Sequence, residues 1–416
     1  MKLLVIGSGG REHAIAKKML DSPKVTMVYC AKGNPGMEKD GIQLVDIPEN
    51  DHSALITFAK TNEIAWTFVG PEIPLLNGIV DAFQAAGLKI FGPNKAAAMI
   101  EGSKEFAKKI MDQNNIPTAA YRTFSDFEQA SKYAKEVGAP IVIKADGLAA
   151  GKGVVVAKSE TEALQALKDM LTDHRFGTSG NKVVIEEFLA GEEFSLLAFV
   201  KNEKVYPMVI VQDHKRAYDG DRGPNTGGMG AYSPVPQISE AIVEQAIEEV
   251  LKPAAKGMMA NKTPFTGILY AGLIVTDTGP KVIEFNARFG DPETQVVLPR
   301  LTSDLVQVIE DLFNGCEPEL TWSKGAAVGV VLAADGYPNE HKKGMVLPDF
   351  TKETKLYYAG VSSSKNQLIA SGGRVLSVVA EADSLAEAQL KAYQSLTEVD
   401  TTDYFYREDI GAKASI

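Results

Sequence analysis

The stretch Lys144-Ala145-Asp146-Gly147-Leu148-Ala149-Ala150-Gly151-Lys152-Gly153-Val154 decides the fold prediction, because it joins two apolar runs through a glycine-rich loop. Ile141-Val142-Ile143 predicts a strand before the loop, and Val154–Ala157 predicts a strand after it. Glycines allow backbone N–H groups to approach phosphate oxygens, and lysines supply positive charge. The loop is not a Walker A sequence, since Gly153 stands where Ser or Thr would bind Mg²⁺. Taken alone, the stretch fits a triphosphate site and a plain hairpin with solvated lysines equally well.

The segment Glu284-Phe285-Asn286-Ala287-Arg288-Phe289-Gly290-Asp291-Pro292-Glu293 is the strongest candidate for a metal site. Residues two apart share one face of a strand, so a strand here would place Glu284, Asn286 and Arg288 side by side. Two oxygen ligands suit a hard cation such as Mg²⁺, and a guanidinium suits a carboxylate or phosphoryl group. The alternative is an exposed polar face, but the preceding Lys281-Val282-Ile283 favours burial.

The segment Glu186-Glu187-Phe188-Leu189-Ala190-Gly191-Glu192-Glu193-Phe194-Ser195 has the order of groups that a nucleotide requires. A base needs an apolar slot and a backbone partner, and a ribose needs a carboxylate for its hydroxyls. Glu187, Leu189 and Glu193 are the candidates for these contacts. Considered alone, however, the segment is better explained as an acidic surface hairpin.

The turn Gly7-Ser8-Gly9-Gly10-Arg11-Glu12 follows an apolar run and half matches the dinucleotide-binding pattern G-x-G-x-x-G. Glu12 stands where the third glycine belongs, and no acidic residue clearly takes the ribose position about 20 residues on. Such a turn still exposes a helix N-terminus, which favours an anion. A simple strand-to-helix turn is the favoured interpretation, and a nicotinamide-dependent oxidoreductase is an alternative.

Two further segments concentrate polar groups. Gln212-Asp213-His214-Lys215-Arg216 gathers charge after an apolar run, and Asp221–Tyr232 is a long glycine-rich loop. Long ordered loops are usually functional. The alternative is a flexible linker, although Arg222 and Asn225 among the glycines argue against it.

The first 92 residues alternate short apolar runs with helical stretches, which predicts a parallel sheet covered by helices. Ser103–Asn114 is expected to be an amphipathic helix, with Lys104, Lys108 and Lys109 on its polar side. Later strands are expected at Ala327–Leu332 and Arg374–Ala380. The expected strands of the first region are Leu3–Ile6, Val25–Tyr29, Ala65–Val69 and Lys89–Phe91.

Composition excludes several classes of protein. The chain of 416 residues is long enough for two to four domains, and its formal net charge of −11 argues against a general nucleic-acid or membrane-surface binder. Cys30 and Cys316 lack the spacing of a zinc or redox motif, and the five histidines show no metal-ligand spacing. The short apolar N-terminus is expected to be a strand rather than a signal peptide, so the cytoplasm is the expected compartment.

In their order along the chain, these motifs resemble the ATP-grasp superfamily and, within it, the phosphoribosylamine–glycine ligase family. The resemblance spans nearly the whole chain, and its last two stretches are highly specific. It implies an α/β fold with an N-terminal parallel-sheet domain (1–102), an ATP-grasp region (103–322, with a lid at about 120–190) and a small C-terminal α+β domain (323–416). The matching stretches are Gly7–Ala14, Gly70-Pro71-Glu72, Lys144–Val154, Asn225–Pro234 and Glu284–Gln295.

The resemblance also implies a role for each matching residue. The implied catalytic residues are Arg288, Lys144 and Asp213. The implied ATP-binding residues are Lys104, Lys144, Gly151, Gly153, Glu187, Leu189 and Glu193. Glu284 and Asn286 would hold Mg²⁺ or Mn²⁺. The implied substrate-binding residues are Gly9, Gly10, Arg11, Glu12, Pro71, Glu72, Asn225, Thr226, Gly228, Asp291, Pro292 and Glu293.

One departure from the superfamily pattern concerns the metal. Many ATP-grasp enzymes carry a second metal-binding acid on the preceding strand, but Tyr270–Val275 contains none. Asp213 is the candidate for that role.

The activity implied by the resemblance is the ATP-dependent joining of glycine to 5-phosphoribosylamine through glycyl phosphate, as a step of purine biosynthesis. The expected partners are these three small molecules, with no nucleic acid or membrane, and the chain is expected to be a monomer. Alternatives are another ATP-grasp carboxylate–amine ligase, a nicotinamide-dependent oxidoreductase and a non-catalytic nucleotide sensor.

Overall fold

The computed structural model describes residues 1–147, 153–173, 175, 180–351 and 353–415. Its N-terminal part is a five-stranded parallel sheet in the order β3-β2-β1-β4-β5, as the alternating pattern predicted. The strands are β1 (Lys2–Gly7), β2 (Met27–Lys32), β3 (Gln43–Val45), β4 (Ile64–Val69) and β5 (Ile90–Phe91). The helices are α1 (Gly10–Leu20), the 3-10 helix Pro35–Asp40, α2 (His52–Thr61), α3 (Glu72–Leu76), α4 (Ile79–Ala85) and α5 (Lys95–Gly102).

Both faces of this parallel sheet are buried. Along β1, Leu3 and Val5 enter one apolar core, while Leu4 and Ile6 enter another, because successive side chains of a strand point to opposite faces. The first core also contains residues of α12 (Leu305–Asn314), and α11 (Thr294–Arg300) packs on α1. A late segment of the chain therefore covers the N-terminal sheet, as a sheet buried on two sides requires.

Two antiparallel sheets form the middle of the chain. The first has the order β11-β10-β16-β17, and the second has the order β6-β9-β7-β8. The strands of the first are β10 (Glu192–Lys201), β11 (Lys204–Pro207), β16 (Thr266–Thr276) and β17 (Gly279–Asn286). Its helices are α6 (Lys104–Gln113), α9 (Glu240–Ala246) and α10 (Lys252–Ala260). The π-helix Ile247–Leu251 connects α9 to α10. The second contains β6 (Tyr121–Phe124), α7 (Phe127–Val137), β7 (Ile141–Ala145), β8 (Val154–Ala157), α8 (Glu160–Leu167), the π-helix Lys168–Thr172 and β9 (Val183–Glu187).

The C-terminal sheet recruits strands from the middle of the chain. β12 (Gln212–Asp213) and β15 (Gly230–Ser233) extend the order β12-β15-β18-β22-β19, with Gly230 opposite Val330. β13 (Arg216–Tyr218) and β14 (Arg222–Asn225) form a hairpin between them. The remaining elements are β18 (Ala326–Ala334), β19 (Lys355–Tyr358), β20 (Val361–Ser364), β21 (Gln367–Ala370), β22 (Arg374–Ala382), α13 (Leu385–Thr397), β23 (Tyr404–Phe405) and the 3-10 helix Ala412–Ser415.

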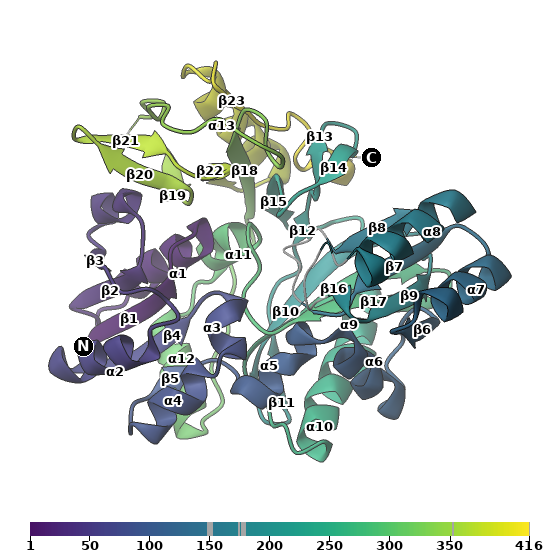
Figure 1. Cartoon of the computed structure of the whole chain (residues 1–416). Coiled ribbons are helices and arrows are strands. Elements are labelled where there is room, and N and C mark those ends of the chain that lie inside the picture. The colour runs from purple at the N-terminus through teal and green to yellow at the C-terminus, as the bar shows by residue number, and fades with distance from the viewer. Residues whose placement is uncertain (148–152, 174, 176–179, 352, 416) are drawn as a thin grey trace.

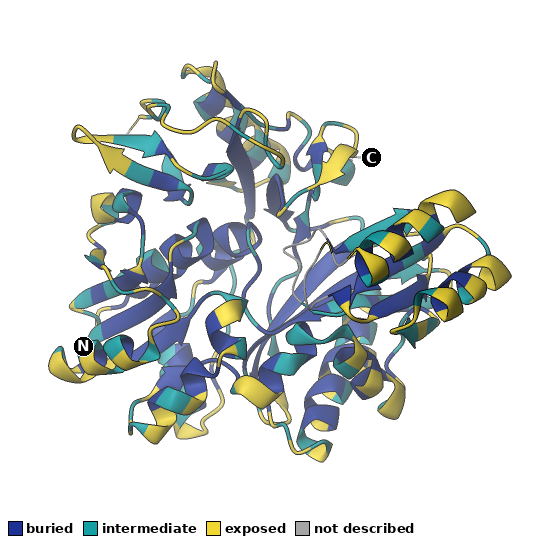
Figure 2. Ribbon diagram, viewed as in Figure 1, coloured by how far each residue is buried: buried dark blue, intermediate teal, exposed yellow. Residues whose placement is uncertain are grey.

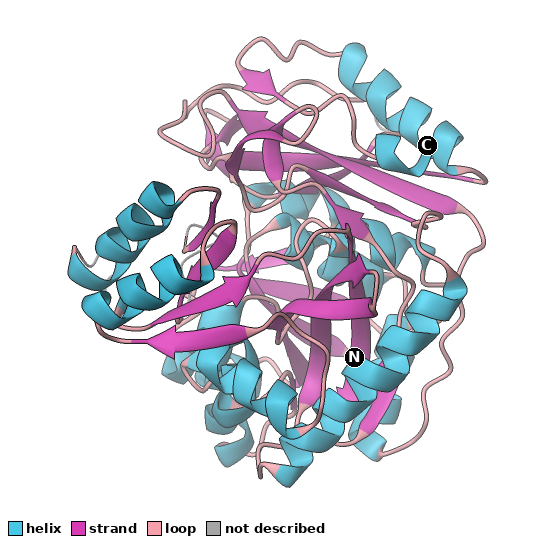
Figure 3. Cartoon of the chain, turned by 90° about the vertical axis from the view of Figure 1, so that its right-hand side faces the viewer, coloured by secondary structure: helices cyan, strands magenta, loops and turns pink. Residues whose placement is uncertain are grey.

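These parts surround a common centre (Figure 1), with the parallel sheet on the left, the β6–β9 sheet on the right and the C-terminal sheet above. The strands are mostly buried, whereas α7 and α8 expose their outer faces (Figure 2). The side view places α7 and α8 on the outer side of their sheet (Figure 3). Among the described residues, every helix is too short or too polar to cross a bilayer.

His13 on α1 connects the N-terminal sheet to the C-terminal one. Its Nδ1 accepts the backbone N–H of Tyr358 at 2.9 Å, and its Nε2 lies 2.8 Å from a carboxylate oxygen of Asp40. Since a backbone N–H only donates, Nδ1 must be unprotonated, so the neutral ring donates from Nε2 to Asp40. Burial lowers the pKa of His13 below its ordinary value, although Asp40 opposes that shift.

The neutral His13 predicts a stability loss in acid. A lowered folded-state pKa contributes stability that is present above about pH 6.5 and is lost as the pH falls below it. Between about pH 7.5 and pH 5.5, the free energy of unfolding should fall by about 1 kcal/mol more in the wild type than in His13→Gln. Denaturant titrations check this, with His341→Gln, a partly exposed histidine, as control. Parallel pH curves for wild type and His13→Gln would contradict it.

Candidate active site

The site begins at the point where the strand order of the parallel sheet reverses, between β1 and β4, where open α/β sheets bind ligands. The loops after these strands carry Gly7 and Gly70. The side chain of Glu12 fills the space over both glycines, and a Cβ at Gly70 would lie 2.1 Å from its Oε1. Its other oxygen accepts the N–H of Gly9 at 2.7 Å, so the protein's own carboxylate caps α1. This occupation disfavours a nicotinamide dinucleotide at the turn.

Asp291 joins the turn to two other parts of the chain. It accepts a hydrogen bond from the backbone N–H of Arg11, and its Oδ1 lies 2.9 Å from Nε2 of Gln295 and 3.3 Å from Nη1 of Arg374 on β22. Burial alone would raise its pKa, but Arg374 and Arg11 lower the pKa of Asp291 below its ordinary value. The Arg11 guanidinium itself binds Glu12 at 2.5 Å and the carbonyl of Phe289 at 3.1 Å.

The glycine-rich loop before β15 packs against the same segment. Gly228 has a φ of +114°, and a Cβ there would lie 2.4 Å from Cδ of Pro292, so glycine is required for this approach. The hydroxyl of Thr226 accepts the N–H of Gly228 and donates to the carbonyl of Lys215, both at 2.9 Å. The structure therefore brings the Thr226–Gly228 segment together with Pro292, while the neighbouring Asn225 is exposed.

Two lysines share one buried carboxylate beside the phosphate-loop strand. Lys144 Nζ lies 2.8 Å from one oxygen of Glu186, and Lys108 Nζ lies 3.2 Å from the other. Lys108 is only 2% exposed, so one of the polar residues of this amphipathic helix is buried with its charge paired. Lys104 and Lys108 are four residues apart, and this i, i+4 spacing is the sequence signal that places both on one helix face.

Lys104 approaches the phosphate loop from α6. Its Nζ donates to the carbonyl of Gly147 at 3.2 Å, and its backbone N–H donates to Asp146 at 2.6 Å. Burial lowers the pKa of Lys104, and the nearby Lys144 lowers it further. The predicted phosphate ligand Gly151 lies outside the described residues, while Gly153 accepts the N–H of Ala145 at 2.8 Å next to β8.

Glu284 lies at the meeting point of several cations. Burial by itself would raise its pKa, but Lys215, Lys144 and Lys104 lower the pKa of Glu284 below its ordinary value. A bulge in β17 leaves Ile283 without a partner on β16, and the Ile283 carbonyl accepts Lys144 Nζ at 2.9 Å. The charges of these three lysines therefore favour the ionised form of Glu284.

Asn286 and Arg288 are neighbours, but not through strand alternation. β17 ends at Asn286, and Arg288 lies beyond it with Nη2 at 3.4 Å from Oδ1 of Asn286. Arg288 binds Glu101 through Nη2 at 2.7 Å and Glu72 through Nε at 3.1 Å. Burial would lower the pKa of Arg288, but the carboxylates of Glu101 and Glu72 raise it above its ordinary value.

Asp213 has Lys215 as its main opposite charge. Burial raises the pKa of Asp213 to about 7, and Glu293 and Glu193 raise it further, while Lys215 opposes the shift. Lys215 is the cation common to Asp213 and Glu284. In the described part of the chain, the acidic, histidine and cysteine side chains form no group of three suited to a metal ion.

Glu293 connects the segment after β17 to the strands β16 and β10. Its side chain is almost fully buried, and its Oε1 accepts the hydroxyl of Tyr270 at 2.6 Å. The same hydroxyl lies 2.8 Å from that of Ser195 on β10. Glu293 is thereby connected to the strands that carry the nucleotide segment.

The predicted nucleotide segment lies between the two middle sheets. The N–H of Glu187 donates to the carbonyl of Ala120 at 2.8 Å, Leu189 is partly buried, and Glu193 lies 3.3 Å from Lys215.

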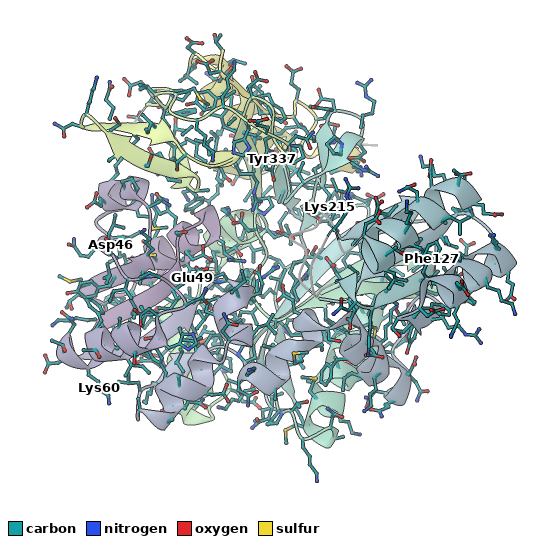
Figure 4. The ribbon with its side chains drawn as sticks, in the orientation of Figure 1. Asp46, Glu49, Lys60, Phe127, Lys215 and Tyr337 are labelled. Carbon is teal, nitrogen blue, oxygen red and sulfur yellow. The ribbon has the colours of Figure 1, made fainter. Side chains whose placement is uncertain are left out.

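Lys215 extends from the segment after β12, and Figure 4 places it across the centre of the molecule from Glu49. Burial raises the pKa of Glu49, and its charged neighbours are Glu12, Arg11 and Glu72.

The functional groups that the sequence did not single out are Glu101, Lys108 and Arg374. Glu101 and Arg374 contact the segment after β17 from residues far away in the sequence, so no local spacing identifies them. Pro71 precedes α3, which begins at Glu72. Gly10 approaches the C-terminal sheet, since a Cβ there would lie 3.5 Å from the carbonyl of Tyr357.

Three family models cover the chain. The phosphoribosylglycinamide synthetase N domain matches residues 1–101, its ATP-grasp (A) domain matches residues 102–294, and its C domain matches residues 327–413. The phosphoribosylamine–glycine ligase of Streptococcus pyogenes serotype M1 is 58% identical over 418 aligned positions, which cover 100% of this chain and 99% of the relative. The enzyme of that name from Listeria innocua is also 58% identical and is covered completely.

The chain belongs to the phosphoribosylamine–glycine ligase family. Members of this family are ATP-dependent ligases of the ATP-grasp type. The crystal structure of phosphoribosylamine–glycine ligase from Thermotoga maritima superimposes with a TM-score of 0.87 at 33% identity, covering 99% of this chain and all of that one.

The fold of this ligase family member is shared more widely. The biotin carboxylase domain of the Hydrogenobacter thermophilus 2-oxoglutarate carboxylase superimposes with a TM-score of 0.76 at 14% identity, covering 97% of this chain and 91% of that one. The likeness supports the α/β fold, and the match to the ATP-grasp (A) domain model confirms the predicted ATP-grasp architecture.

The pairing of Lys108 with Glu186 predicts a stability effect. Lys108→Met removes one of the two cations on a buried carboxylate, which should lower the free energy of unfolding by about 2 kcal/mol while Lys144 keeps its contact. Lys109→Met changes the exposed neighbour on the same helix and should leave it within about 0.5 kcal/mol of wild type. Denaturant titration of the three proteins measures both effects, and equal losses in the two variants would contradict the assignment.

Proposed function

We propose that this chain joins glycine to 5-phosphoribosylamine, with conversion of ATP to ADP and phosphate, in purine biosynthesis. The proposal is carried by the full-length identity to enzymes named phosphoribosylamine–glycine ligase. The site supports it, because Lys104, Lys144 and Lys215 converge on Glu284 beside Arg288. Such a set of charges suits the transfer of a phosphoryl group, which requires positioning and electrostatic stabilisation more than covalent chemistry.

The proposed chemistry has two steps. A carboxylate oxygen of glycine attacks the γ-phosphorus of ATP, and the bond from that phosphorus to the β,γ-bridging oxygen breaks, giving glycyl phosphate and ADP. The amine of phosphoribosylamine then attacks the acyl carbon and loses a proton, and phosphate leaves. Lys144 and Arg288 are placed to stabilise the negative charge of the transferring group. Asp213 is the third residue that we propose to be catalytic.

A divalent cation fits the proposed chemistry. The pKa of the half-buried Glu284 is lowered, which favours its charged form, and the buried Asn286 offers an amide oxygen two residues on; these are ligands that Mg²⁺ or Mn²⁺ accepts. When bound there, the cation would neutralise phosphate oxygens.

The other proposed contacts are those that the resemblance to the family implies. Lys104, Lys144, Gly151 and Gly153 would contact the phosphates of ATP, Glu187 and Leu189 the adenine, and Glu193 the ribose. Glycine and phosphoribosylamine would lie among residues of the loops after β1 and β4, the glycine-rich loop before β15 and the segment after β17. These are Gly9, Gly10, Arg11, Glu12, Pro71, Glu72, Asn225, Thr226, Gly228, Asp291, Pro292 and Glu293.

We also propose the division of the chain into an N-terminal domain (1–102), an ATP-grasp region (103–322) with its lid at about 120–190, and a C-terminal domain (323–416). The β6–β9 sheet with α7 and α8 is the part that corresponds to the lid. We expect the chain to act as a monomer in the cytoplasm.

The route through an acyl phosphate predicts the fate of a labelled oxygen. With glycine carrying heavy oxygen in its carboxylate, the phosphate released should contain one labelled oxygen, measured by mass spectrometry. ADP release should require both glycine and phosphoribosylamine. Equal ADP release when bicarbonate or D-alanine replaces glycine would contradict the substrate and favour a different ATP-grasp ligase. Unlabelled phosphate would contradict the mechanism.

The metal assignment predicts a rescue by cation concentration. Glu284→Gln and Asn286→Ala each remove one ligand, so the transition state should lose about 2–4 kcal/mol of stabilisation. Steady-state rates should recover in part at high Mg²⁺ or Mn²⁺. Near-normal activity of both variants at limiting Mg²⁺ would place the metal elsewhere.

A further inference from the structure

Glu101 makes two contacts with the segment that carries Arg288. It lies near the end of α5, and its side chain is 5% exposed. Its Oε1 lies 2.7 Å from Nη2 of Arg288, and its Oε2 accepts the backbone N–H of Ala287 at 2.8 Å. One carboxylate therefore holds both the guanidinium and the peptide group that precedes it.

The two carboxylates on Arg288 differ in their surroundings. Glu72 binds Nε from the first turn of α3, and its side chain is 27% exposed, against 5% for Glu101. Arg288 also donates to the carbonyl of Phe289 at 3.2 Å. Because Glu101 is the more buried partner and also binds the backbone, it is the contact that fixes the guanidinium. The Nε side, held by Glu72, is the more accessible one.

We propose that Glu101 is a positioning residue for the ligase reaction, one that holds Arg288 and the backbone before it in place for phosphoryl transfer. The inference rests on the proposed function of Arg288. Because Glu101 also binds the N–H of Ala287, it ties the guanidinium of Arg288 to the backbone of the preceding residue, which limits rotation of the long side chain. Displacement of a charge-stabilising group by about 1 Å is enough to cost a large factor in rate.

The position of α5 in the chain also relates the Glu101–Arg288 contact to Lys104. α5 ends the N-terminal part of the chain, and α6, which carries Lys104, follows it directly. Glu101 and Lys104 therefore place two predicted phosphate-binding cations, Arg288 and Lys104, relative to the same short stretch of backbone. The contact thereby fixes the N-terminal part of the chain, whose loops are proposed to bind substrate, relative to β17, which carries the proposed metal ligands.

The test compares Glu101→Gln with wild type in steady-state assays of the full chain. The amide keeps the size of the side chain and its bond to the N–H of Ala287 but removes the charge that holds Arg288. The value of kcat should fall at least about tenfold, with the KM for ATP within about twofold of wild type. Glu101→Asp, which keeps the charge, should recover part of the lost kcat.

A double-variant cycle separates positioning from a general structural effect. If Glu101 acts through Arg288, then Glu101→Gln should change kcat less than about twofold in an Arg288→Ala background. The double variant removes both members of the Glu101–Arg288 pair, and the carboxylate that then loses Arg288 is that of Glu72, the more exposed of the two, so the double variant can be measured should Glu101→Gln alone fail to fold. Asp304→Asn is the matched control: this carboxylate caps α12 and binds Ser22, and its loss should leave kcat unchanged.

Two outcomes overturn the inference. One is a kcat for folded Glu101→Gln within about twofold of wild type, and the other is a fully additive loss in the Arg288→Ala background. Failure of the proposed function is distinguishable, because in that case the wild type itself would release no ADP in response to glycine and phosphoribosylamine.

Discussion

The buried carboxylate of Asp291 is the contact on which the arrangement of the three parts depends. A buried charge is costly unless hydrogen bonds and opposite charges surround it. Here the partners come from α1, α11 and β22, through Arg11, Gln295 and Arg374. Gln295 is four residues beyond Asp291, whereas Arg11 and Arg374 come from distant parts of the chain, so the carboxylate gains both of these partners only when α1 and β22 are docked. Arg374 also donates to the carbonyl of Gly227 at 2.8 Å, so the glycine-rich loop is included in the same junction.

The same rule explains how several lysines persist in the interior. Lys108 and Lys144 are compensated by Glu186, whereas the partly exposed Lys215 lies 3.3 Å from Glu193. Lys104 has a weaker arrangement, a carbonyl and the nearby Glu284, and its pKa is lowered accordingly. The lysines near the proposed phosphate site therefore differ in how fully neighbouring carboxylates compensate their charge. In this set, Lys104 is the one whose charge would gain most from an incoming anion.

The sequence predicted the parts of the fold that depend on local pattern. The apolar run of β1, the strand Val154–Ala157 and the helix α6 are where the periodicity places them. The joining of β12 and β15 to the C-terminal sheet depends on pairing across about a hundred residues, which periodicity does not encode. Within the site, Glu284 and Asn286 come together as predicted, but Arg288 reaches Asn286 from beyond the strand end. Glu101 and Lys108 were missed because their roles depend on partners distant in sequence.

The residue that breaks the dinucleotide pattern shows how a shared turn acquires a different use. In the usual turn, the second glycine leaves room for a pyrophosphate at the helix N-terminus, and the third allows the helix to pack closely on the strand. Here Glu12 fills that room, caps α1 through Gly9 and binds Arg11. A phosphate entering the same space would have to displace a buried carboxylate from its hydrogen bonds, which is unfavourable. The turn is therefore suited to holding Arg11 and the backbone N–H that binds Asp291, and its glycines serve the packing of Glu12 rather than a bound dinucleotide.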